Sequence, residues 1–100
     1  MSVTSLRAKV KTEHVAQAEE LVRRLFAAVA DNAPEGIRYA STKSADGQTF
    51  VVLLQLDDGV IDNPIVEYPE FKELQAGLTE WMEQPPAMDQ LTVIGSYRLF

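Results

Sequence analysis

The stretch Thr49–Leu56, which reads TFVVLLQL, is nearly continuous in apolar residues. Branched and aromatic side chains of this kind favour an extended strand. Successive side chains of a strand point to opposite faces of its sheet, and here both faces are apolar, with Phe50, Val52, Leu54 and Leu56 on one and Val51 and Leu53 on the other. Because such a strand is covered on both sides, the stretch is predicted to be a central strand.

The sequence before this strand predicts a strand, a helix and a second strand. Val3–Lys11 alternates between apolar and polar residues, as a half-buried strand does. Thr12 is a suitable N-cap for a helix that ends near Asn32. Apolar residues recur along that helix at helical spacing and form one stripe: Val15, Ala18, Val22, Leu25, Phe26 and Val29. Ile37–Lys43 is a short strand, joined to the central strand by a turn in which Gly47 supplies a positive φ.

The sequence after the central strand predicts a connection, a helix and a last strand. Asp57–Glu67 is longer than a minimal turn, and long connections often border binding sites. A helix is expected from Pro69, a favourable first-turn residue, with a buried face of Phe71, Leu74, Leu78, Trp81 and Met82. Pro85 and Pro86 block further helix. Leu91–Phe100 is then predicted to be the strand that closes the sheet.

This order of elements predicts one α+β domain over residues 1–100, a ferredoxin-like split βαββαβ fold with a four-stranded antiparallel sheet. Both helices of such a fold cover the same sheet face, which leaves Val51 and Leu53 on the other face. A large exposed apolar patch usually marks an interface. We therefore expect a homodimer in which two sheets pack face to face. The alternative is a monomer whose second face is half apolar.

Charge and composition limit the classes of partner. The chain has 9 basic and 15 acidic residues, a net charge of −6 and no cysteine. This balance disfavours nucleic acids and anionic membrane surfaces as partners, and without cysteine no disulfide or thiolate nucleophile is available. The N-terminus shows no basic stretch followed by an apolar run, and no apolar run is long enough to span a bilayer. We expect a cytoplasmic protein.

The order of elements, with Lys11–Val15 opening the first helix and Pro69–Gln75 opening the second, resembles the antibiotic biosynthesis monooxygenase-like family of dimeric α+β barrel proteins. The end of the chain, Gly95–Phe100, is similar to that of small actinobacterial proteins of unassigned role. The resemblance implies a pocket between sheet and helices in each subunit. It also implies functions found among such proteins, which include cofactor-free oxygenation of polycyclic phenols and haem degradation. The sequence departs from many relatives because no tryptophan follows the third strand and no histidine enters the second helix. The haem-degrading function therefore lacks its expected axial ligand, and no cofactor is expected.

Tyrosine and arginine side chains are the candidate catalytic groups. Tyr68, at the entry of the second helix, and Tyr97, on the predicted last strand, could exchange a proton with a phenol. Arg7, on the first strand, could hold a carboxylate or stabilise an enolate, although an ion pair with one of the many acids is the simpler interpretation. His14 is the only histidine, and a solvent-exposed position is favoured over a base or a metal ligand. No metal site is expected, because no clustered ligand motif occurs.

Four further residues are candidates for binding a small aromatic ligand: Trp81, Asn63, Tyr39 and Phe71. Trp81 and Phe71 also fit the buried face of the second helix, and Asn63 also fits a turn before Pro64. Two functions therefore stay open at the level of sequence. One is a cofactor-independent oxygenase acting on a polycyclic phenol. The other is a non-enzymatic dimeric module that binds a small ligand or a partner.

Overall fold

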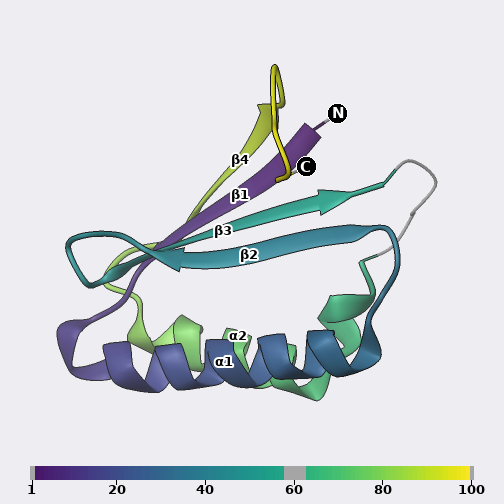
Figure 1. The fold of residues 1–100 in the computed structure, drawn as a ribbon. Helices are drawn as coiled ribbons and strands as arrows, with labels where there is room; N and C mark the ends of the chain where they lie inside the picture. The colour runs from purple at the N-terminus through teal and green to yellow at the C-terminus, as the bar shows by residue number, and fades with distance from the viewer. Residues whose placement is uncertain (1, 58–62, 100) are drawn as a thin grey trace.

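The structure is a computed structural model that describes residues 2–57 and 63–99. It has two layers, a sheet and a pair of helices that lie side by side beneath it (Figure 1). The strands are β1 (Ser2–Lys9), β2 (Ile37–Lys43), β3 (Thr49–Leu56) and β4 (Ala87–Thr92); the helices are α1 (Val15–Asn32) and α2 (Pro69–Trp81), with short 3-10 helices at Thr12–His14 (η1) and Pro64–Glu67 (η2). The predicted βαββαβ order and α+β class are confirmed.

The sheet has the strand order β2-β3-β1-β4, with every pairing antiparallel. The apolar stretch 49–56 is β3, an inner strand as predicted. It pairs with β2 from Ile37↔Leu56 to Lys43↔Phe50, and with β1 from Thr4↔Leu54 to Lys9↔Thr49. β2 and β4 are the edges. This register puts Phe50, Val52, Leu54 and Leu56 on the helix side, and leaves Val51 and Leu53 half-buried on the other side.

The core lies between the two layers and has two clusters. One joins Val10, Ala18 and Phe50 at the start of α1, and the other joins Leu25, Ile65 and Leu74 in the middle of α1 and α2. Leu25, Ile65 and Val10 are the largest side chains with no exposed surface. The apolar stripe predicted along residues 15–29 therefore faces the sheet and α2.

The first helix begins differently from the prediction. Thr12 opens η1 rather than capping α1, and Lys11 occupies its N-cap position without a side-chain hydrogen bond. His14 then precedes α1 and stacks on Trp81 with ring centroids 5.3 Å apart and planes inclined by 12°. This contact joins the start of α1 to the end of α2, so His14 is half-buried rather than solvent-exposed. Sequence periodicity carries no signal of such a contact because the two rings are far apart in the chain.

The last strand was predicted at Leu91–Phe100 and the structure corrects it to β4, Ala87–Thr92. The pairing with β1 explains the difference. Thr92 is opposite Ser2, where β1 begins, so residues beyond Thr92 have no further residue of β1 to pair with. Positions 93–99 accordingly have no regular secondary structure, and Arg98 has a positive φ of 62°. Phe100 lies outside the described residues.

The turn between β2 and β3 is organised by one carboxylate. Asp46 accepts hydrogen bonds from the Thr49 hydroxyl at 2.6 Å, from the Ser44 hydroxyl at 2.9 Å, and from the backbone N–H groups of Gln48 and Thr49 at 2.9 Å each. Gly47 has φ 74°, as the turn requires. These bonds favour the ionised carboxylate, the Thr49 hydroxyl most strongly, and hold the pKa of Asp46 well below its usual range.

Replacing Asp46 with alanine is expected to lower the melting temperature at neutral pH, because four donors lose their acceptor. A carboxyl whose pKa is lower in the folded than in the unfolded chain contributes stability above its unfolded value, about 3.9. That contribution is lost as the pH falls through the folded pKa. The gap in melting temperature between wild type and Asp46→Ala should therefore narrow below about pH 4. Asp31→Ala, at an exposed acid on α1, is the control; a gap that stays constant with pH would contradict the assignment.

Candidate functional site

A cavity lies between the sheet and the helices, at the place where the pocket was expected. Its volume is about 20 Å³, enough for about one water molecule. The lining is apolar apart from two hydroxyl-bearing residues of β2, Tyr39 and Ser41; the other lining residues are Leu6, Ala8, Val22, Leu25, Phe26, Phe50, Val52, Leu74 and Leu78. The cavity is thus a small apolar void with two hydroxyl-bearing residues on one wall, well below the roughly 300–1,000 Å³ of ligand pockets in proteins.

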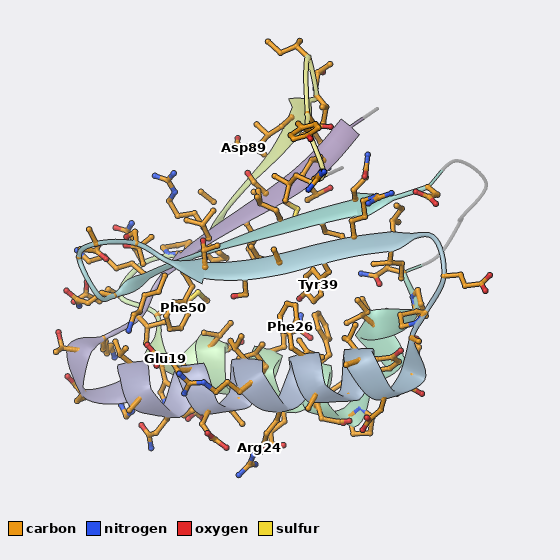
Figure 2. The ribbon with its side chains drawn as sticks, viewed as in Figure 1. Glu19, Arg24, Phe26, Tyr39, Phe50 and Asp89 are labelled. Carbon is orange, nitrogen blue, oxygen red and sulfur yellow. The ribbon has the colours of Figure 1, made fainter. Side chains whose placement is uncertain are left out.

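Among the described residues, Tyr39 is the one ionisable group that lines this cavity. Its ring stacks on Phe26 of α1, with centroids 4.8 Å apart and planes inclined by 16°, so the two rings face each other between α1 and the sheet (Figure 2). Burial disfavours the charged phenolate and raises the pKa of Tyr39 above its ordinary value of 10.0. The phenol is therefore neutral at physiological pH and can donate a hydrogen bond.

A groove between α1 and the outer edge of β2 adjoins the cavity. Its volume is about 340 Å³, and Val22, Ser41 and Phe50 line both spaces. The other residues around the groove are Glu19, Arg23, Thr42 and Lys43. These three shared residues therefore lie between the groove and the cavity.

Charged side chains line the rim of this groove. Lys43 of β2 forms an ion pair with Glu19 of α1, and Arg23 approaches the other oxygen of the same carboxylate at 3.5 Å. The hydrogen bond from Lys43 lowers the pKa of Glu19. Since these side chains are largely solvated, the ion pairs add little stability. The Lys43–Glu19 pair does, however, join β2 to α1 across this groove.

The predicted catalytic residues lie in three separate places. Tyr68 packs against the Leu25 cluster at the start of α2. Tyr97 is 81% exposed in the segment after β4, with the Arg98 guanidinium 5.1 Å from its ring centroid. Arg7 is exposed on the sheet face away from the helices, as its pairing with Val51 requires. The structure brings none of these three to the cavity, and their catalytic roles stay predictions.

The predicted ligand-binding residues divide between the cavity and the surrounding scaffold. Tyr39 lines the cavity. Phe71 packs against the Leu25 cluster and does not line the cavity. Asn63 has the turn role: its side-chain oxygen accepts a hydrogen bond at 3.0 Å from the backbone N–H of Ile65 and caps η2. Trp81 packs against the Phe50 cluster and borders a shallow groove on the outer side of α1 and α2.

The candidate site residues predicted from the sequence do not include Ser41 or Phe26 of the cavity, nor Glu19 and Lys43 at the rim of the groove. A signal for Ser41 was present, because Tyr39 and Ser41 are two residues apart on one strand and therefore share a face of β2. No comparable signal exists for the rim, since Glu19 and Lys43 meet only when α1 is laid along β2.

Within residues 2–57 and 63–99, no group of three histidine or acidic side chains is placed to hold a metal ion. No helix in the described part of the chain is long and apolar enough to cross a bilayer.

The fold is shared with several solved structures. A structure described as a putative antibiotic biosynthesis monooxygenase from Nitrosomonas europaea superposes with a TM-score of 0.76 at 20% identity, over 95% of this chain and 100% of that one. Structures given the same description from Caulobacter crescentus and Deinococcus radiodurans have TM-scores of 0.73 and 0.70 at 23% and 12% identity, covering 94% and 97% of this chain and 90% and 96% of those. No protein-family model matches the sequence, and no curated protein matches it.

These comparisons define the class of protein at the level of fold. The chain has the ferredoxin-like fold of the antibiotic biosynthesis monooxygenase-like proteins, as the sequence resemblance implied. The similarity runs along nearly the whole chain, so the two-layer arrangement that encloses the cavity belongs to the shared fold.

Proposed function

We propose that this protein binds a small planar phenol between α1 and the sheet and acts on it as a cofactor-independent oxygenase. The observation that carries the proposal is the apolar cavity with one neutral phenol, Tyr39, on its wall. The monooxygenase descriptions of three structures with the same fold support the reaction class. A fold hosts many activities, so the site carries the argument.

Binding requires the cavity to open. Ligand pockets in proteins measure about 300–1,000 Å³, whereas this cavity measures about 20 Å³. The adjoining groove supplies about 340 Å³ and is separated from the cavity by shared side chains, Phe50 among them. Rotation of Phe50 and separation of the Lys43–Glu19 pair would merge the two spaces. The ligand would then lie beside Phe26 and Tyr39.

The chemistry follows from the neutral state of Tyr39. A neutral hydroxyl can donate a hydrogen bond to a phenolate oxygen, which favours the anion of the ligand in an otherwise apolar site. The anion carries electron density on its ring carbons and can react with O₂. The phenolic proton passes to water as the anion forms. In a ligand whose phenol is conjugated with a ring CH2 group, that carbon reacts with O₂ and becomes a carbonyl: it loses two hydrogens and gains one oxygen atom, and the other oxygen atom leaves as water with those two hydrogens. The four electrons that reduce O₂ come from the substrate, the phenolic proton returns to the product, and Tyr39 keeps its own proton.

A non-enzymatic binding module is the second candidate. The observation that favours it is the separation of Tyr68, Tyr97 and Arg7, which leaves Tyr39 and Ser41 as the hydroxyl-bearing residues at the cavity. Oxygen uptake distinguishes the two functions. A phenol that binds saturably and consumes no oxygen would establish the binding module.

Tyr39→Phe is expected to weaken phenol binding about tenfold, because one hydrogen bond to a charged oxygen contributes roughly 1.5 kcal/mol. Trp81 is the only tryptophan and packs against the cluster that contains Phe50, so its fluorescence should report ligand entry. Titration of wild type and variant with a panel of polycyclic phenols and their non-phenolic analogues measures the effect. Tyr68→Phe, outside the cavity, is the matched control. Equal affinities in all three proteins would exclude Tyr39 as the ligand contact.

A further inference from the structure

A groove lies between α1 and α2 on their outer side, away from the sheet. Its volume is about 540 Å³, within the range of about 300–1,000 Å³ that is typical of ligand pockets. Figure 2 shows one of its lining residues, Arg24, pointing away from the sheet. The groove and the cavity between the layers have no lining residue in common, so the two are separate sites.

One end of the groove is apolar and is built around Trp81. The residues that line this end are Ala16 and Leu21 of α1 and Gly77 and Trp81 of α2. The Trp81 ring stacks on His14 with centroids 5.3 Å apart, and a Cβ at position 77 would lie 2.9 Å from the ring. The ring therefore lies across α2 only because position 77 has no side chain. The stack on His14 holds it there as a preformed aromatic wall.

The other end of the groove is charged. The Nε of Arg24 is 3.6 Å from Oε1 of Glu20, and its Nη1 is 3.6 Å from Oε1 of Glu73. Two carboxylates thus share one guanidinium, which leaves a net charge of −1 at this end, and Oε2 of each carboxylate has no partner within residues 2–57 and 63–99. An anion at this end would be repelled by two carboxylates, whereas a cation would be attracted by them.

We propose that this groove binds a small organic cation with an apolar tail, an alkylammonium or an arylalkylammonium. The tail would lie against Trp81 and Leu21, and the ammonium group would contact Oε2 of Glu20 or Glu73. The two ends of the groove are about 12 Å apart, because Glu73 and Trp81 are about two helical turns apart along α2. An extended alkyl chain can span that length.

The size and the place of the groove favour a small molecule over a protein partner. Stable protein interfaces use about 20–30 residues on each side, whereas eight residues line this groove. A second copy packed against the open face of the sheet would leave the groove uncovered, because α1 and α2 lie on the other face (Figure 1).

Three probes that share one tail and differ in charge test the proposal: octylammonium, octanol and octanoate, each below the concentration at which it forms micelles. Backbone amide NMR titration of the wild-type chain measures their dissociation constants. Octylammonium should bind saturably, with its largest shifts on the amides of Gln17, Leu21, Gly77 and Trp81. Octanol should bind about threefold more weakly, as expected for the loss of an exposed ion pair. Octanoate should bind more weakly still, and added salt should reduce the differences.

Charge removal tests the contact with the ammonium group. Glu20→Gln and Glu73→Gln should each bring the affinity for octylammonium closer to that for octanol, and the double variant should abolish the difference. Glu35→Gln, an exposed acid between α1 and β2, makes the same chemical change away from the groove and is the matched control. It should keep the wild-type preference. Variants at Glu20 and Glu73 that keep this preference would overturn the assignment of the cation to these carboxylates.

Filling the apolar end tests the contact with the tail. Ala16→Leu, at an exposed position of α1 that lines the groove, should weaken binding of both octylammonium and octanol. Ala30→Leu, exposed near the end of the same helix and outside the groove, is the control and should bind both probes as the wild type does. Unchanged binding by Ala16→Leu would overturn the placement of the tail.

The result is independent of the phenol site. Octylammonium should leave the amides of Tyr39 and Ser41, which line the cavity between the layers, unshifted. Shifts centred on those residues, or equal affinities for all three probes, would overturn the proposed cation site.

Discussion

Leu25→Ala is expected to lower the free energy of unfolding by about 3 kcal/mol. Leu25 has no exposed surface and forms a cluster with Ile65 and Leu74, where α1, η2 and α2 meet. Truncation of a fully buried leucine typically costs about 2–5 kcal/mol, from lost burial and from the void that remains. Because domains of this size are stable by only about 5–15 kcal/mol, urea unfolding should show a large shift of the midpoint.

The location of Leu25 adds a second expectation to this variant. Leu25 lines the cavity between the layers, so its truncation enlarges that cavity. A small apolar phenol should therefore raise the melting temperature of Leu25→Ala more than that of the wild type. Val66→Ala, at a 41% exposed position, is the control for truncation at the surface and should change stability only slightly. Similar losses from both variants would contradict the assignment of the Leu25 cluster as the core.

Gly77→Ala is expected to destabilise the protein by roughly 1–3 kcal/mol through overpacking, although alanine is the better helix former by about 1 kcal/mol. A Cβ at position 77 would lie 2.9 and 3.0 Å from two carbons of the Trp81 ring and 3.3 Å from a Leu21 methyl carbon. The Trp81 ring also stacks on His14. A shift of the ring would therefore disturb the junction between α1 and α2.

Two readouts separate overpacking from helix propensity. The free energy of unfolding of Gly77→Ala should fall, and the emission of Trp81 should change in the folded state. Ala76→Gly, at the neighbouring exposed position of α2, reports the propensity difference without a ring contact. If Gly77→Ala gains stability by about as much as Ala76→Gly loses, the ring does not lie against position 77.

The fold was predictable because its signals are local. Alternation in Val3–Lys11, continuous apolarity in Thr49–Leu56 and helical spacing after Thr12 each depend on residues within a few positions of one another. The last strand was the exception. Its apolar residues predicted a strand at 91–100, but the end of a strand is set by the length of its neighbour, and β1 begins at Ser2. That limit comes from pairing between residues 90 positions apart, which no local pattern records.

The candidate site was predictable only in part. The pocket between sheet and helices followed from the family resemblance, and Tyr39 was among the candidate ligand contacts. Tyr68 lies at the entry of α2 and Phe71 lies on the helix, as predicted, yet both pack against the cluster of Leu25, Ile65 and Leu74 and neither lines the cavity. The stack of Tyr39 on Phe26 brings together residues of β2 and α1 through the packing of one layer on the other. Aromatic residues that are equally apolar in sequence thus take different roles once the helices are oriented.

The most direct test of the proposed site is a backbone amide NMR spectrum of the wild-type protein, recorded with and without one phenol. That phenol is the one that changes the fluorescence of Trp81 most strongly in the titration. If the ligand binds between α1 and the sheet, the largest shifts should fall on the amides of Val22, Phe26, Tyr39 and Ser41, which border the cavity or the adjoining groove. Shifts confined to β4, or to the outer side of α1 and α2 around Gln17 and Glu73, would contradict binding at this cavity.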